Sequence, residues 1–302
     1  MPQPANTGSA STQPANTGPA NVGPAATRPA VQHLVVRYAK RGKMRFASHR
    51  DVARAFERGV RRAGLPIAYS AGFTPHPKIS YAGGAPTGVA SEAEYLTLAL
   101  TARQDETQVC QRLDAALPDG IDVIDVTEAL GGPGGKASPL DRAQDRAQDR
   151  GSAAGSSPRA DTSFRHLEAS RWRVVLPGVE PVAAQQAVAG FLALGEAPVE
   201  RLTDKGVRRL DARAAVIEMN VETNVVQMGP AVAGPDGGQR AVVTGDEDCA
   251  ILRMVVLHTA PAVRPEDIVT ALREQAGLVP SSPPMTTRLA QGPRALLTGE
   301  GS

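Results

Sequence analysis

The chain has 302 residues, which predicts two domains at about 100–200 residues each. Its 33 lysines and arginines nearly balance its 31 aspartates and glutamates. This balance excludes a simple histone-like polycation, although it leaves room for a local basic patch. The two cysteines, Cys110 and Cys249, are too few for a four-cysteine zinc site or an iron–sulfur cluster, and we expect no cofactor or metal. The absence of a disulfide framework fits a reducing cytosol.

Several stretches are predicted to lie outside the packed domains. Residues 1–31 repeat PANTG with one charge and no aromatic residue, which predicts a disordered tail. Residues 131–167 contain GGPGG and DRAQDRAQDR and predict a flexible linker, with a short charged helix as the alternative. Residues 228–241 predict a long loop, and residues 293–302 a C-terminal tail. No run of 18 apolar residues and no signal-peptide pattern occurs, so we expect a cytoplasmic protein without membrane contact.

The first ordered block, residues 32–130, is predicted to run β-α-β-β-α-β. Ser48 and Asp51 form a capping-box pattern at the start of its first helix, which Gly64 and Pro66 end. Apolar residues at helical spacing predict the core face of that helix: Val52, Phe56, Val60 and Ala63. The other predicted elements are a strand at 33–40, extended pieces at 67–71 and 78–82 around a loop at 72–77, a strand at 94–102, a helix at 105–117 and a strand at 121–129.

The second ordered block, residues 168–292, has a similar order of predicted strands and helices. Its predicted elements are strands at 172–176, 215–221 and 251–259, helices at 182–194 and 265–277, and a weaker final strand near 286–290. The alternation of two-residue and 3.6-residue periods in this order is typical of the split βαβ unit. The sequence therefore predicts an α+β protein of two tandem ferredoxin-like units.

Charge is strongly polarised along the first block. Residues 32–91 hold 11 lysines and arginines against two acids, whereas residues 92–130 hold two arginines against nine acids. Four arginines of the first helix recur every fourth residue and form what we call the arginine stripe: Arg50, Arg54, Arg58 and Arg62. Like charges at this spacing repel, so helix stability does not explain the stripe. It is either a solvated face paired with the domain's own acids or a docking surface for phosphate or an acidic partner.

Two histidines, His49 and His76, lie in stretches that are rich in charged and hydroxyl side chains. His49 falls at the first helical position, where the helix dipole favours neutral imidazole. His76 is held between two prolines, where it either binds a ligand or fixes its loop by a backbone hydrogen bond. Asp51 is either the capping partner of Ser48 or, with the two histidines, part of an acid–base or metal site. The sequence contains no standard catalytic motif, and the spacing of these residues does not indicate a metal.

We expect His49 and His76 to face one shared cleft at an edge of the first sheet. Cationic side chains would line this cleft and make it suitable for an anionic group: Arg45, Arg54, Arg58 and Lys78.

The stretch 37–100 contains a long and specific set of motif positions. They begin with Lys40, Gly42, Arg45, Phe46, Ser48, His49 and Asp51, continue with Arg61, Arg62, Leu65, Pro66, Tyr69, Ser70, Gly72, Phe73, Pro75, His76 and Pro77, and end with Gly88, Ser91, Glu94 and Tyr95. With these positions the stretch resembles the bacterial radical-SAM-linked proteins, a domain family without an assigned activity. Lys205, Gly206 and Asp211 resemble a shorter motif of the family's C-terminal half.

The resemblance implies a radical S-adenosylmethionine protein as the partner. The chain lacks the cysteine motif that holds such an enzyme's iron–sulfur cluster, so we expect an accessory or substrate-presenting subunit. Two alternatives stay open at this point. One is an RNA-binding protein that uses the arginine-rich helix, and the other is an enzyme with a His49, Asp51 and His76 site.

Overall fold

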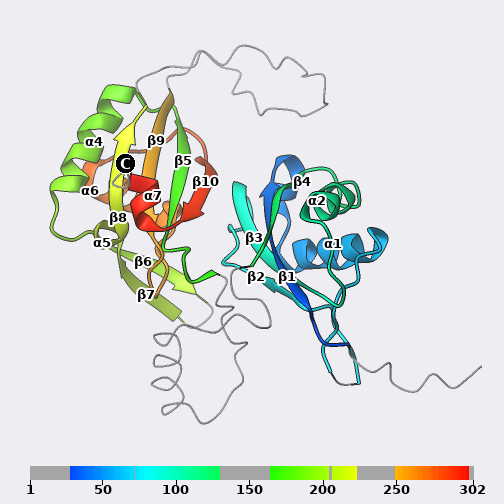
Figure 1. Cartoon of the computed structure of the whole chain (residues 1–302). Coiled ribbons are helices and arrows are strands. Elements are labelled where there is room, and N and C mark those ends of the chain that lie inside the picture. Colours follow the sequence, from blue (N-terminus) through cyan, green and yellow to red (C-terminus); the bar gives the residue numbers. More distant parts are fainter. Residues whose placement is uncertain (1–27, 72, 130–163, 204–205, 223–248, 299–302) are drawn as a thin grey trace, which may run out of the picture.

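The structure is a computed structural model that describes residues 28–71, 73–129, 164–203, 206–222 and 249–298. Its first half follows the predicted order of elements (Figure 1). The elements are β1 (Gln32–Lys40), the 3-10 helix η1 (Gly42–Phe46), α1 (His49–Arg62), β2 (Ile79–Tyr81), β3 (Ala90–Leu100), α2 (Glu106–Asp114) and β4 (Ile121–Glu128).

The second half adds a hairpin and two short helices to the predicted elements. It consists of β5 (Ala169–Pro177), α4 (Pro181–Ala193), β6 (Pro198–Thr203), β7 (Gly206–Asp211), α5 (Ala212–Ala215), β8 (Val216–Val221), β9 (Cys249–Leu257), α6 (Pro265–Ala276), β10 (Met285–Gly292) and α7 (Arg294–Thr298). The mixed α+β class predicted from the sequence is confirmed.

One eight-stranded sheet runs through both halves. Its order is β4-β1-β3-β10-β5-β9-β8, and β2 pairs with the other end of β3. The two halves meet where β10 pairs with β3 in parallel, with Thr287 opposite Ala90 and Arg288 opposite Ser91. All other neighbours in this sheet are antiparallel. The hairpin β6–β7 forms a separate two-stranded sheet.

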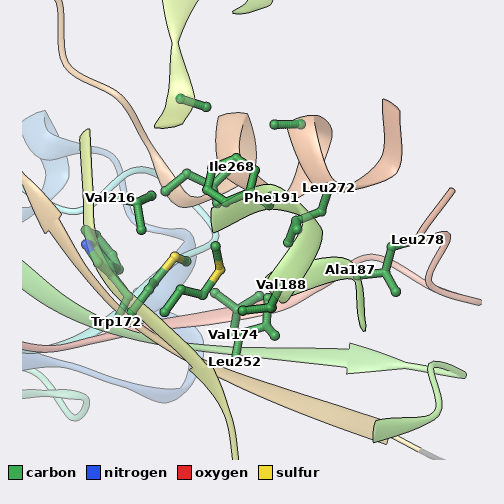
Figure 2. Packing of buried hydrophobic residues seen from close by; sticks show 14 of the residues in the cluster. Trp172, Val174, Ala187, Val188, Phe191, Val216, Leu252, Ile268, Leu272 and Leu278 are labelled. Atoms are coloured by element: carbon green, nitrogen blue, oxygen red, sulfur yellow. The ribbon is translucent and has the colours of Figure 1, made fainter. Parts of the chain in front are cut away.

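Each half has its own apolar core under its helices. In the first half, Phe56 of α1 and Leu113 of α2 are buried against the side chains of β1 and β3 that include Leu34 and Leu98. Figure 2 shows the second core, where Phe191 of α4 and Ile268 and Leu272 of α6 lie over Val174 and Leu252 of the sheet. Val89, which directly precedes β3, is buried in this second core, so the first half contributes to the core of the other.

The short helix α7 covers the opposite face of the second half. Its buried Leu297 contacts Ala169 and Val255, which belong to a cluster separate from that of Val174. Successive residues of a strand point to opposite faces, so Ala169 and Val174 lie on different sides of β5. This helix lies within residues 293–302, for which the sequence predicted a tail.

Other details differ from the predicted elements. The piece at 67–71 is not a strand and makes isolated bridges, such as Ile67 with Leu100. The strand predicted at 94–102 begins at Ala90. The hairpin β6–β7 was not predicted from the sequence. The predictions for residues 1–27, 131–163 and 228–241, together with Gly72 and Lys205, lie outside the described residues.

Candidate functional site

Asp51 is fully engaged in capping α1. Its Oδ2 atom accepts from the Ser48 backbone N–H at 3.2 Å and from Ser48 Oγ at 2.6 Å, while Ser48 Oγ accepts from the Asp51 N–H at 3.2 Å. These hydrogen bonds, with smaller contributions from Arg54 and Arg50, lower the pKa of Asp51. Of the two roles considered from the sequence, the structure supports the cap, and a catalytic role has no geometric support.

His49 lies at the first position of α1, as predicted, beside the chain segment that follows β2. Its ring meets the ring of Tyr81 edge-on, with the centroids 5.2 Å apart. A Cβ atom built on Gly84 would lie 3.6 Å from His49 Cδ2, so a side chain at this position would reach the imidazole. His49 is exposed and lies at the border between α1 and residues 82–84.

His76 is held by backbone interactions in a different loop. Its N–H donates to Ser70 Oγ at 3.0 Å, and the Ser70 N–H donates to the His76 carbonyl at 2.9 Å. From Pro77 to Tyr81 the chain advances by four residues, or about 13 Å if extended. The contacts of His49 and His76 thus lie on different segments of the chain, and the shared cleft stays a prediction. Lys78, two residues after His76, is exposed.

The arginine stripe is exposed on α1. Arg50, Arg54 and Arg58 form no ion pair with any residue in the described part of the chain. The acids on β3 and β4 are engaged elsewhere, for example with Arg41, which binds Glu92 and Asp122. In the described residues the stripe is therefore a solvated face without ion pairs to the domain's own acids, and its use as a docking surface stays a prediction. Arg62, at the end of the stripe, donates to the Ala116 carbonyl at 3.1 Å.

The 3-10 helix η1 adds cationic and aromatic surface just before α1. Arg45 Nε donates to the Gly88 carbonyl at 2.7 Å, and the Gly88 N–H donates back to the Arg45 carbonyl at 2.7 Å. The Arg45 guanidinium lies 5.4 Å from the centroid of the Phe46 ring, which is 66% exposed. The predicted binding residue Arg45 thus has a structural role as well, because it ties η1 to the segment before β3.

A cluster of buried charges lies where the two halves meet, and we call it the charge cluster: Lys40 of β1, Glu94 of β3 and Arg288 of β10. Arg288 Nη1 donates to Glu94 Oε1 at 3.1 Å and to the Gly83 carbonyl at 3.0 Å, and its guanidinium lies 4.7 Å from the centroid of the Trp172 ring. Glu94 Oε2 accepts from the Ala85 N–H at 3.0 Å. Lys40 Nζ donates to the carbonyls of Ala85 and Pro86 at 3.0 and 3.2 Å.

Burial perturbs the titration of this cluster. Desolvation lowers the pKa of Lys40 and of Arg288, although the nearby carboxylate of Glu94 acts in the opposite direction on both. Burial also raises the pKa of Tyr38, which lies directly opposite Glu94 in the sheet. Lys40 and Glu94 belong to the positions that carry the sequence resemblance. Arg288 was missed, because an arginine in a weakly predicted strand gives no local sign of a buried partner.

A second polar contact links the buried Ser170 with His258, which is exposed at the surface of the fold. Ser170 Oγ lies 2.6 Å from His258 Nε2, and His258 Nδ1 lies 2.7 Å from the Leu167 carbonyl. This arrangement fits a neutral imidazole that donates from Nδ1 and accepts the Ser170 hydroxyl at Nε2. Ser170 is fully buried, so its hydroxyl is not accessible to a substrate.

We expect the Ser170–His258 contact to make stability depend on pH. Burial lowers the pKa of His258 from its ordinary value of 6.5. The unfolded chain then binds the proton more readily, so the free energy of unfolding should fall as the pH drops below about 6.5 and level off below the folded pKa. Urea unfolding between pH 7.5 and 5 measures this. His258→Gln should flatten the profile in this range, and an identical pH profile in the variant would contradict the assignment.

The described ranges contain no group of three or more histidine, cysteine, aspartate or glutamate side chains placed to hold a metal ion. Cys110 and Cys249 are free thiols, and burial raises the pKa of Cys110. None of the helices in the described part of the chain is both long and apolar enough to cross a membrane.

Comparisons with known proteins assign the chain to a family. No curated protein matches it. Among solved structures, a DypB variant in complex with manganese aligns over 90% of this chain and 96% of its own, at 13% identity and a TM-score of 0.21, which carries no argument about fold or function. Residues 33–265 match the family described as "Uncharacterized protein conserved in bacteria (DUF2344)". Because this match spans most of the sequence, the chain belongs to that bacterial family.

Proposed function

We propose that this chain is an accessory subunit of a radical S-adenosylmethionine enzyme and docks through the arginine stripe of α1. The resemblance of residues 37–100 to radical-SAM-linked proteins supports the kind of partner. The free cysteines fit work in the reducing cytoplasm, where such a partner would keep its cluster. In this role the chain binds the enzyme or presents its substrate, and it carries out no chemistry itself.

The observation that carries the docking role is that Arg50, Arg54 and Arg58 are exposed and form no ion pair with the residues that the structure describes. Repulsion at i,i+4 spacing costs helix stability, and α1 is stabilised by other features, namely its capping box and its buried face with Phe56. Exposed cations without ion pairs in the described part of the chain create a positive potential that attracts an acidic partner, although Asp51 and Glu57 of the same helix offset part of it. A complementary acidic patch on the enzyme would accelerate association and select the orientation of docking.

RNA is the second candidate for the same surface, and Phe46 is the observation that favours it. This ring is 66% exposed and lies beside Arg45, immediately before α1. Exposed aromatic rings stack on unpaired bases, while arginines contact the phosphates. In this alternative the chain would present an RNA substrate to the radical enzyme or act on RNA alone.

Reversing the charge of the stripe tests the docking role. We expect the double variant Arg54→Glu/Arg58→Glu to lose at least tenfold in co-purification with the co-expressed radical S-adenosylmethionine protein. Its thermal midpoint should not fall, because the exchange places opposite charges four residues from Arg50 and from Arg62. Arg273→Glu, at an exposed position of α6, is the matched control. Equal recovery of the enzyme with both variants would contradict docking through α1.

The same variants separate the enzyme partner from RNA. If RNA occupies the stripe, wild-type protein should retain RNA with a steep salt dependence, and Arg54→Glu/Arg58→Glu should flatten that dependence. Retention of RNA without co-purification of the enzyme would favour the second candidate.

We also propose that each half is a ferredoxin-like unit. The pairing orders β4-β1-β3-β2 and β10-β5-β9-β8 support this, because both place the fourth, first, third and second long strands of a half side by side and antiparallel. In each half one helix follows the first strand and another precedes the fourth. This is the arrangement of the split βαβ unit, with the hairpin β6–β7 inserted in the second copy.

A further inference from the structure

Residues 83–88, which we call the strap, cover the charge cluster with backbone atoms alone. The carbonyls of Gly83, Ala85 and Pro86 accept from Arg288 and Lys40, and the Ala85 N–H donates to Glu94. The buried charges therefore hold the strap through its backbone carbonyls and one backbone N–H. No charged or hydroxyl side chain of the strap takes part in these contacts.

The charge cluster lacks one negative charge and one hydrogen-bond acceptor. It holds two cations and one anion, and all three side chains are more than nine-tenths buried. Within the described part of the chain, Arg288 Nε is the buried side-chain nitrogen without a hydrogen-bond partner. A buried N–H of a charged group without an acceptor is costly. A single oxyanion at this position would supply both the acceptor and the missing charge.

Hydrogen bonds to buried or partly buried side chains, and few apolar contacts, hold the strap in place. It belongs to no helix or strand, and it reads GGAPTG. Cβ atoms built on Gly83 or Gly88 would meet nothing within 4 Å, so neither position is packed. Ala85 is the strap residue that packs against the second core. Opening the strap would thus cost few apolar contacts, and its main cost would be the hydrogen bonds to Lys40, Glu94 and Arg288, which a bound oxyanion replaces in part.

We propose that the charge cluster is a binding site for an oxyanion, a carboxylate or phosphate group, and that the strap covers this site until it opens. The oxyanion would accept from Arg288 Nε and replace the two carbonyls on Lys40 Nζ. Glu94 would keep its ion pair with Arg288, so two cations and two anions would balance. The exposed His49, whose imidazole lies 3.6 Å from a Cβ atom built on Gly84, marks the side from which the group would enter.

Inorganic phosphate is the probe, and Pro86→Gly is the variant that tests the strap. This change leaves every charge and every backbone carbonyl in place but makes the open strap more favourable by increasing its conformational freedom. Apparent affinity rises with the fraction of molecules whose site is open, so we expect phosphate to bind Pro86→Gly about two- to fivefold more tightly than wild type. Calorimetric titration of the full chain at constant ionic strength, against chloride, measures this. Pro118→Gly, at an exposed position after α2, is the matched control and should bind as wild type does.

Binding to exposed arginines predicts a different result. If phosphate binds wild type, Pro86→Gly and Pro118→Gly equally, or binds none of them, the proposal is wrong. Arg288→Lys keeps the charge and removes Nε, and in the folded variant we expect phosphate affinity to fall at least tenfold. Unchanged affinity in that variant would also overturn the proposal. If Arg288→Lys does not fold, the phosphate affinities of Pro86→Gly and Pro118→Gly still test the proposal.

Discussion

Glu94→Ala should destabilise the protein by about 3–5 kcal/mol, because it leaves two buried cations without their carboxylate. Glu94 is 3% exposed and joins β3 to Arg288 on β10, while its second oxygen holds the strap through Ala85. Removing one partner of a buried ion pair costs far more than the net contribution of the pair, since the other charge stays buried. Urea unfolding followed by circular dichroism would measure the loss.

Glu92→Ala is the control for this prediction. Glu92 lies two residues away on the same strand and pairs with Arg41, but both side chains are partly exposed to solvent. Such a pair contributes little to stability, and we expect a loss below about 1 kcal/mol. Similar losses in the Glu94 and Glu92 variants would show that the charge cluster does not hold the two halves together.

Phe56→Ala should cost about 3–5 kcal/mol, the usual range for removing a buried phenylalanine. Its ring is fully buried under α1, with the Tyr38 ring 4.7 Å and the Tyr81 ring 6.4 Å away between centroids. The loss combines the transfer of the ring to water with the cavity that it leaves. Because α1 rests on this side chain, the position of the arginine stripe should be disturbed as well. The unfolding free energy and the affinity for the partner should fall together.

Phe46→Ala tests whether an exposed phenylalanine affects binding without affecting stability, in contrast to the buried Phe56. Phe46 is 66% exposed on η1, so its removal should change stability by less than about 0.5 kcal/mol. If RNA occupies the surface, this variant should still lose affinity for single-stranded RNA, because a stacking ring is gone. A large loss of stability in Phe46→Ala, or none in Phe56→Ala, would contradict the assignment of the two rings.

Local signals in the sequence were enough to predict α1 and its surroundings. The Ser48–Asp51 pattern specifies where the helix begins, and apolar residues such as Phe56 at helical spacing specify its buried face. Both signals act within one or two turns, so they can be recognised without knowledge of the rest of the fold. The exposure of the arginine stripe follows directly, because its residues lie opposite that face.

The junction of the halves could not be predicted in the same way. It depends on two residue pairs between β3 and β10 and on the contact of Glu94 with Arg288, which are 194 positions apart. A weak strand pattern near 286–290 does not indicate which strand of the other half the predicted strand pairs with. The hairpin β6–β7 was missed because only Val199 and Leu210 of its residues are buried, so the sequence lacks a clear alternation of apolar and polar residues.

The candidate site shows the same division between local and distant contacts. The capping role of Asp51 was among the predicted alternatives, because its partner is three residues away. The shared cleft of His49 and His76 assumed that the loop after the helix returns to the helix start. In the structure, Ser70 binds the backbone of His76, whereas the ring of Tyr81 contacts the ring of His49, so the two histidines have different neighbours.

The central claim, docking of an acidic partner on the arginine stripe, is tested most directly by affinity measured at two salt concentrations. Wild type, Arg54→Glu/Arg58→Glu and Arg273→Glu would be titrated with the purified radical S-adenosylmethionine protein at about 50 and 500 mM salt, where the screening length differs several-fold. We expect wild type and Arg273→Glu to bind tightly at low salt and to lose most of that affinity at high salt. The double variant should be at least tenfold weaker at low salt and close to wild type at high salt. Equal affinity of all three proteins at low salt would contradict the claim.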